Sequence, residues 1–202
     1  MLSVLQFLFN LSGNYGTAVV LLTIIIKFAL YPLTLQSTRQ MDAMQKIQPK
    51  VQELQKKFKD KPDQLQKETV ALYKQEGVNP LGGCLPMLLQ IPFFIGLFVA
   101  LTSKEFAALL SAEGVSANFL WIGNLAKPDP TYVMVALIGI STYLSQITMP
   151  GAGSKQQKGM LYFMPAFIAF ISMKFPAGVQ LYWTVSNLLT VAQQLYISRV
   201  KK

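Results

Sequence analysis

The sequence lacks histidine altogether and contains a single cysteine, Cys84, among its 202 residues. Without histidine, a serine or cysteine nucleophile would lack its usual general base. One thiol with no histidine and no nearby carboxylate provides neither a zinc site nor an internal disulfide. We therefore expect no catalytic residues, no metal site and no cofactor, which leaves hydrogen bonding and charge as the available chemistry.

Acidic residues are also scarce, and all of them fall between the apolar stretches of the chain. There are nine Asp and Glu against 18 Lys and Arg, a net charge of +9. The buried aspartates of a transmembrane protease and the carboxylate relays of ion pumps are therefore missing. Hydrophobic residues make up 52% of the chain, charged residues 13%, and the mean hydropathy is +0.38. This composition is typical of a membrane protein with several spans.

One positive charge, Lys27, lies near the middle of the apolar stretch 17–35. A helix of that length spans about 28 Å, close to a hydrocarbon core of about 30 Å. An ammonium at that depth costs about 2.5 to 3.5 kcal/mol, and the side chain covers only about half of the distance to the end of the stretch. Because no carboxylate is available there, we interpret Lys27 as part of a hydrated polar cavity.

The apolar stretches predict an all-α membrane protein with five transmembrane helices, at 17–35, 84–102, 132–149, 160–175 and 179–200. The remaining segments are predicted as an external interfacial helix and turn at 1–16, a cytoplasmic helical hairpin at 36–80, an external segment at 103–131 and a cytoplasmic loop at 150–159. Lys and Arg are concentrated in the proposed cytoplasmic parts, which places the N-terminus outside and the C-terminus in the cytoplasm.

The predicted hairpin begins with one narrow apolar stripe at helical spacing, formed by Met44, Ile47, Val51, Leu54 and Phe58. A second helical pattern follows and stops before Asn79-Pro80. Two interpretations remain open. The hairpin is either a self-satisfied antiparallel pair with a solvated basic face, or a docking surface for substrates, ribosomes or acidic lipid.

Polar side chains recur at helical spacing inside the predicted spans. The last span carries them at Gln180, Trp183, Asn187, Thr190 and Gln194, while Thr23 precedes Lys27 by one turn and Gln146 follows Thr142 by one turn. Interhelical hydrogen bonding would explain any one of them. Together with an unpaired lysine, they favour a shared wet cavity, in which a hydrophilic segment would meet a lower desolvation barrier than in lipid.

Several motifs resemble the YidC-type family of membrane protein insertases, and they occur in the family's order over essentially the whole chain. They are Gly13-Asn14-Tyr15-Gly16, Lys27-Phe28-Ala29-Leu30-Tyr31-Pro32-Leu33-Thr34, Gln48-Pro49-Lys50, Asn79-Pro80-Leu81-Gly82-Gly83-Cys84-Leu85-Pro86, Gln90-Ile91-Pro92, Phe163-Met164-Pro165, Phe175-Pro176-Ala177-Gly178, Leu181-Tyr182-Trp183 and Val185-Ser186-Asn187-Leu188.

The resemblance implies a five-helix core around a hydrophilic groove that is open to the cytoplasm and to lipid and closed outside. The family's groove charge, usually arginine, falls on Lys27 in this sequence, and the residues that fall on the groove side are Thr23, Gln146, Tyr182, Trp183 and Asn187. A lysine keeps the charge but not the planar five-donor group of arginine.

The implied function is that of a membrane protein insertase and chaperone in the bacterial inner membrane, not an enzyme. It would receive hydrophobic nascent proteins from the cytoplasm, alone or with the general translocon. The implied partners are nascent membrane proteins, the translocon, the ribosome and membrane lipids, with no specific nucleic acid. Two alternatives remain, namely a small-solute channel or transporter that uses the same cavity, and an assembly factor that binds membrane subunits without inserting them.

Overall fold

The computed structural model describes residues 1–79, 82, 85–111, 115, 118–150 and 155–200. Its helices are α1 (Leu2–Ser12), α2 (Tyr15–Ala29), α3 (Tyr31–Lys57), α4 (Pro62–Gln75), α5 (Leu85–Thr102), α6 (Lys104–Leu110), α7 (Val133–Ile147), α8 (Lys155–Ser172) and α9 (Ala177–Val200). The described residues contain no β-strand, only an isolated bridge between Phe119 and Ile122. The all-α class predicted from the sequence is confirmed. Cys84 lies outside the described residues. Of the predicted helix end at Asn79-Pro80, only Asn79 is described.

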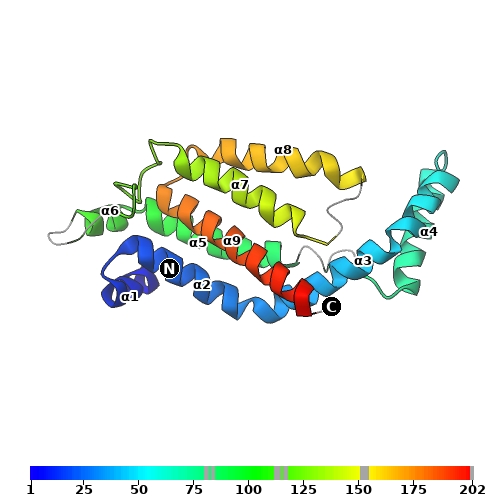
Figure 1. The fold of residues 1–202 in the computed structure, drawn as a ribbon, viewed down its shortest axis with the longest axis horizontal. Helices are drawn as coiled ribbons and strands as arrows, with labels where there is room; N and C mark the ends of the chain where they lie inside the picture. Colours follow the sequence, from blue (N-terminus) through cyan, green and yellow to red (C-terminus); the bar gives the residue numbers. More distant parts are fainter. Residues whose placement is uncertain (80–81, 83–84, 112–114, 116–117, 151–154, 201–202) are drawn as a thin grey trace.

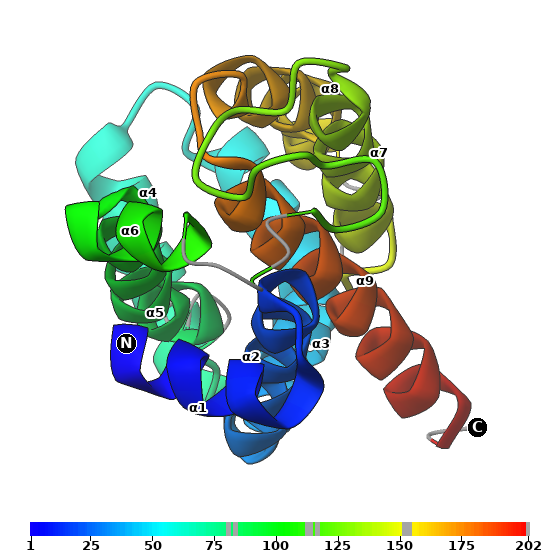
Figure 2. The same cartoon turned by 90° about the vertical axis from the view of Figure 1, so that its left-hand side faces the viewer.

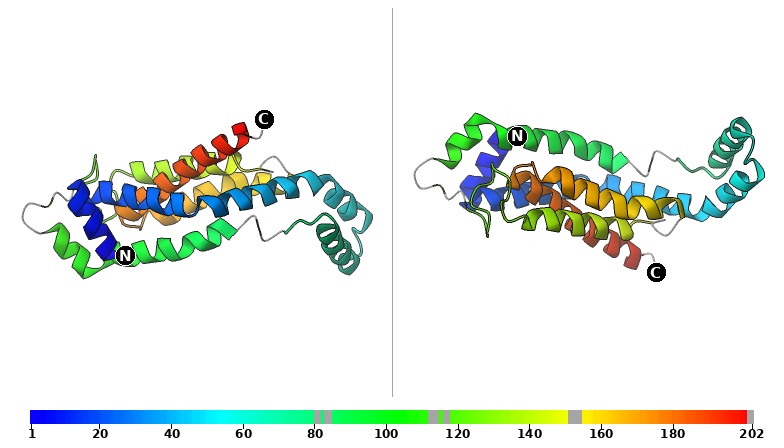
Figure 3. Two further views of the ribbon diagram at one scale, coloured as in Figure 1. Left: turned by 90° about the horizontal axis from the view of Figure 1, so that it is seen from below. Right: turned by 90° about the horizontal axis from the view of Figure 1, so that it is seen from above.

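Helix α9 lies in the middle of the bundle and packs against α2, α5 and α7, while α8 packs on the far side of α7 (Figures 1 and 2). Helices α1 and α6 gather at one end, with the loop that precedes α7. The α3–α4 pair projects beyond the bundle at the other end (Figure 3). The bundle is therefore built round its last helix.

The stretch 17–35, expected to form one helix, is divided at Leu30 between α2 and α3. Pro32, in the first turn of α3, lacks an N–H donor and would clash with a carbonyl one turn earlier if the helix continued. The two helices nevertheless follow one another in nearly the same direction (Figure 3).

None of the described helices, taken singly, is both long and apolar enough to cross a membrane. Two bent pairs meet that length and composition together, namely α1 with α2 at 114°, and residues Leu88–Thr102 with α6 at 61°. Shorter apolar helices occur at Val133–Ile147 and Gly159–Ser172.

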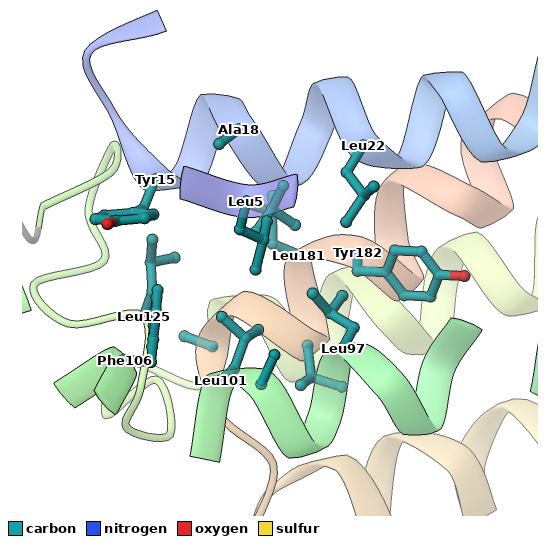
Figure 4. Packing of buried hydrophobic residues seen from close by; sticks show 14 of the residues in the cluster. Leu5, Tyr15, Ala18, Leu22, Leu97, Leu101, Phe106, Leu125, Leu181 and Tyr182 are labelled. Carbon is teal, nitrogen blue, oxygen red and sulfur yellow. The ribbon is translucent and has the colours of Figure 1, made fainter. Parts of the chain in front are cut away.

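The apolar core lies at the end where α1, α2, α5, α6 and α9 meet (Figure 4). Tyr15, at the start of α2, stacks on Phe9 at 4.3 Å between ring centroids and meets the edge of Phe106 at 5.1 Å. Leu5 of α1 is fully buried. The first helix, predicted from a simple apolar stripe, thus turns back and seals this end of the bundle.

Two of the residues in the apolar stripe predicted for the hairpin, Ile47 and Val51, are buried in α3. Helix α4 packs against α3, and Lys50 forms an ion pair with Glu76 at 2.5 Å. No residue of α4 is buried. The hairpin is therefore held by one apolar stripe and leaves its second helix exposed.

The first turn of α9 is anchored to the loop that precedes α7. The N–H of Ala177 donates to the carbonyl of Lys127 at 2.8 Å, and that of Gly178 donates to the carbonyl of Leu125 at 2.9 Å. These bonds satisfy donors that a helix N-terminus leaves without intrahelical partners. A side chain at position 178 would have little room, since an added Cβ would lie 2.8 Å from a methyl carbon of Leu101 and 3.2 Å from the Leu125 carbonyl oxygen.

Asp129 organises the start of α7 from a position that is only 3% exposed. Its carboxylate accepts the N–H of Met134 at 3.0 Å, the hydroxyl and N–H of Thr131 at 2.7 and 3.0 Å, and the indole N–H of Trp121 at 3.4 Å. Burial raises the pKa of this carboxyl, but the hydrogen bonds from Met134, Thr131 and Trp121 outweigh it and hold the pKa below its usual value of 3.8.

We expect Gly178→Ala to destabilise the protein by about 1 to 3 kcal/mol, because the methyl group overpacks the contact with Leu101 and Leu125. The measurement is the thermal unfolding midpoint in detergent. Gly123→Ala is the matched control, since the nearest atom to its added Cβ is 4.0 Å away. Equal midpoints for the two variants would contradict the packing argument.

We expect Asp129→Asn to lower stability at pH 7 by about 1 to 3 kcal/mol, because buried hydrogen bonds to a charged acceptor are lost. The folded pKa lies below the unfolded one, so the contribution is present above about pH 4 and disappears as the pH falls through the folded value. Wild type and variant should therefore converge in acid when unfolding is followed by Trp121 fluorescence. A difference that stays constant down to pH 3 would show that the carboxylate charge is not involved.

Candidate functional site

Polar side chains from four helices meet along α9 as one set of residues that two separate groups of hydrogen bonds hold, one around Tyr182, Ser186 and Thr190 and one around Asn187. We call this set the polar seam, and its members are Lys27 of α2, Gln90 of α5, Ser141 and Thr142 of α7, and Tyr182, Ser186, Asn187 and Thr190 of α9. The four helices around the seam are predominantly apolar. The seam is therefore the candidate site.

The positive end of the seam is the half-buried Lys27. Its Nζ donates to the hydroxyl oxygen of Thr190 at 2.9 Å, and Thr190 donates in turn to the carbonyl of Ser186 at 2.8 Å. In the part of the chain that the structure describes, no carboxylate lies within ion-pair distance of this ammonium. An ammonium has three donors, so the contact with Thr190 leaves capacity for water or for a bound segment.

On the α5 side of the seam, Gln90 joins the two central helices. Its side-chain N–H donates to the hydroxyl of Tyr182 and, at 3.4 Å, to the hydroxyl oxygen of Ser186. Tyr182 is 2% exposed. The buried phenol oxygen thus accepts a hydrogen bond from a partly buried amide, as polar groups in an apolar environment usually do.

On the α7 side, Asn187 donates to Thr142 at 2.9 Å and to Ser141 at 3.2 Å. At the C-terminal end of α7, the hydroxyl of Thr148 donates to the side-chain oxygen of Gln194, which extends the polar contact with α9. These bonds tie the two helices together along much of their length.

The structure brings three of the residues predicted from the sequence, Lys27, Tyr182 and Asn187, into the seam. Thr23 is fully buried, and its hydroxyl donates to the carbonyl of Val19 in its own helix at 2.7 Å. The ring of Trp183 packs edge-on against Phe94 at 5.1 Å. Gln146 is partly exposed on α7, outside the seam.

Five seam residues were not predicted as site residues from the sequence, namely Gln90, Ser141, Thr142, Ser186 and Thr190. Tyr182, Ser186 and Thr190 are spaced four residues apart, which places them on one side of α9. That spacing was the signal that could have found them. Gln90 was visible as the one amide within the apolar run of α5.

Helix α9 therefore has two polar sides rather than the single polar face expected from the sequence. One side carries Tyr182, Ser186 and Thr190 toward α5 and α2, and the other carries Asn187 and Gln194 toward α7. Chemically, the first side combines hydroxyls with an ammonium, whereas the second holds neutral groups that bond to one another.

A separate open groove of about 680 Å³ lies between α7 and α8, and its lining includes Ile140, Tyr143, Leu161 and Tyr162. The rings of Tyr143 and Tyr162 stack across it with centroids 6.0 Å apart. The groove contains no seam residue, so the apolar hollow and the polar site are on different parts of the bundle.

Comparison with known proteins gives a consistent family assignment. Residues 7–202 match the family described as 60Kd inner membrane protein. The chain is 42% identical over 196 residues to the membrane protein insertase YidC of Citrifermentans bemidjiense, covering 96% of this chain and 35% of that protein. The corresponding protein of Nitratidesulfovibrio vulgaris is 38% identical over 201 residues, covering 98% of this chain and 38% of that protein. This chain thus spans about a third of the length of these curated relatives.

The fold is similar to a solved structure described as an active YidC insertase with its first transmembrane domain resolved. The TM-score is 0.77 at 26% identity, and the match covers 95% of this chain and 44% of that chain. The resemblance noted in the motifs is confirmed. The location that these comparisons support is a bacterial inner membrane. The chain therefore belongs to the 60Kd inner membrane protein family, together with these YidC insertases.

Proposed function

We propose that this chain is the core of a membrane protein insertase and chaperone. It receives hydrophobic nascent proteins from the cytoplasm and inserts them into the bilayer through a positively charged hydrophilic groove beside the polar seam, alone or with the general translocon. The names of the relatives support this function, and the length that the chain shares with them is the part that carries the seam.

The observation that carries the proposal is the state of Lys27, an ammonium in an apolar helix whose described partner is a hydroxyl. A carboxylate partner would neutralise the charge, whereas Thr190 leaves it able to attract an anion. A unit negative charge about 8 Å away would be attracted by about 2 kcal/mol at an effective dielectric constant of about 20. An acidic tail entering beside α9 would therefore recover part of its desolvation cost.

In the proposed topology the chain crosses the membrane five times, with its N-terminus outside and its C-terminus in the cytoplasm. The two bent pairs and the apolar helices α7 and α8 supply apolar segments for this arrangement. The projecting α3–α4 hairpin, with its exposed second helix, would then face the cytoplasm and receive substrates, ribosomes or the translocon. Lipid surrounds the apolar faces, and no specific nucleic acid or cofactor takes part.

The self-pairing of the seam favours one alternative, an assembly factor in which these polar groups only hold helices together. Asn187, Ser141 and Thr142 satisfy one another without any outside partner. The two functions differ in what they require of Lys27, because a packing role needs its hydrogen bond and an insertase needs its charge.

We expect Lys27→Ala to slow insertion of a one-span substrate with an acidic N-terminal tail by about tenfold, which corresponds to about 1.4 kcal/mol in the barrier. The measurement is protease-protected insertion into liposomes that contain the purified protein. Lys27→Arg should retain most of the activity, since it keeps the charge. Lys174→Ala is the control for loss of an exposed lysine outside the seam.

Equal insertion by wild type and Lys27→Ala would show that the charge of Lys27 is not needed for insertion, while the insertase proposal itself would stand. If folded wild type inserts nothing above empty liposomes, the insertase proposal itself is wrong, and ion flux through the same liposomes would then test the channel.

We expect Asn187→Leu and Thr142→Val each to lower thermal stability, with an interaction energy of about 0.6 to 1.7 kcal/mol between them, because their hydrogen bond joins α7 to α9. A double-mutant cycle on unfolding in detergent measures this coupling. Additive effects would mean that the bond contributes nothing to helix packing, and Asn187 would then be a candidate for substrate contact.

A further inference from the structure

A small polar cavity lies where α3, the end of α7 and the last turns of α9 meet. Its volume is about 200 Å³, and its polar lining consists of Thr38, Asp42, Thr148, Gln194 and Ser198. A space of this size accommodates one side-chain head group with some water, but not a helix. None of these residues belongs to the polar seam.

The lining offers acceptors on its hydroxyls and on Asp42, whereas the Gln194 amide, whose oxygen accepts from Thr148, keeps N–H donors. The hydroxyl of Thr38 already donates to the carbonyl of Thr34 at 2.9 Å, and that of Ser198 donates to the carbonyl of Leu195 at 2.8 Å. With their protons committed in this way, these hydroxyls present lone pairs to the cavity. The Asp42 carboxylate adds the only formal charge in the lining. The chemistry therefore suits a cationic donor, an ammonium or a guanidinium, and opposes an anion.

Asp42 has an interaction of its own within the protein. A carboxylate has about four acceptor positions on its two oxygens, so it can hold one partner and still accept a second donor. The surrounding sequence is basic, with Arg39 and Lys46 on the same helix and a net charge of +9 overall. Asp42 is thus a negative site between two basic residues of α3.

The cavity continues the line of the seam along α9. Thr190, Gln194 and Ser198 follow one another at four-residue intervals, which corresponds to about 6 Å per step. Lys27 therefore meets α9 at Thr190, and the cavity that Asp42 lines meets α9 at Gln194 and Ser198, nearer to its C-terminal end. In Figure 1 this end of α9 lies beside α3.

We propose that this cavity binds a lysine or arginine side chain in the cytoplasmic flank of the segment being inserted. This inference rests on the proposed insertase function and adds a substrate feature to it. Spans whose N-terminus is outside carry their basic residues on the cytoplasmic side. While the acidic tail passes Lys27, the basic flank behind the apolar segment reaches the level of Asp42, which holds it on the cytoplasmic side.

The test compares two one-span substrates with the same acidic tail and apolar segment, one with a Lys-Lys flank and one with a Gln-Gln flank. Both are offered to liposomes that contain wild type, Asp42→Asn or Asp42→Glu. We expect Asp42→Asn to lower insertion of the lysine-flanked substrate about two- to fivefold, the range of a partly exposed charge pair. The glutamine-flanked substrate should not be affected, and Asp42→Glu should retain the preference for lysine.

Glu105→Gln, an exposed carboxylate at the start of α6, at the end of the bundle far from the hairpin, is the matched control and should behave as wild type with both substrates. Equal loss of both substrates in Asp42→Asn, or no loss of either, would overturn the proposal while insertion of the glutamine-flanked substrate still supports the insertase. If wild type inserts neither substrate above empty liposomes, the proposed function and this inference both fail.

Discussion

The structure depends on the need to satisfy the polar side chains of α9 inside an otherwise apolar bundle. A polar group buried without a hydrogen bond costs about 1 to 3 kcal/mol, and α9 carries such groups on two sides. The other helices supply partners for the α9 residues of the seam, with Lys27 from α2, Gln90 from α5, and Ser141 and Thr142 from α7. The side-chain oxygens of Gln180, Thr184 and Gln193 are buried without a hydrogen bond among the described residues. The position of α9 in the middle of the bundle follows from this requirement.

The same requirement distinguishes the helices that contribute residues to the seam from those that do not. Helix α8 packs chiefly on α7 and contributes no residue to the seam. The hairpin α3–α4 projects from the end and is held by Ile47, Val51 and one ion pair. Hydrogen bonds of the seam therefore join α2, α5, α7 and α9, and neither α8 nor the α3–α4 hairpin takes part in them.

Charges of opposite sign lie beside different parts of α9. The ammonium of Lys27 has a neutral partner in Thr190, so its field is not cancelled locally. The cavity with Asp42 brings the opposite sign to α9 at Gln194 and Ser198, one to two turns past Thr190. In the proposed topology, an acidic segment is favoured at the inner level and a basic one at the cytoplasmic level. Binding alone, without a nucleotide or cofactor, would then orient an inserting chain.

Composition and periodicity by themselves determined the all-α class, the apolar stripe of the hairpin, and the presence of a lysine with no carboxylate in reach, because these depend only on which residues occur and at what spacing. The family resemblance rested on local motifs and needed no coordinates. Only the tertiary structure decided that Lys27 meets Thr190, 163 residues away, that Thr23 bonds to its own helix, and that Asn187 faces α7. Helical spacing predicts which side chains share a face of a helix. Which other helix that face contacts depends on how the whole bundle packs.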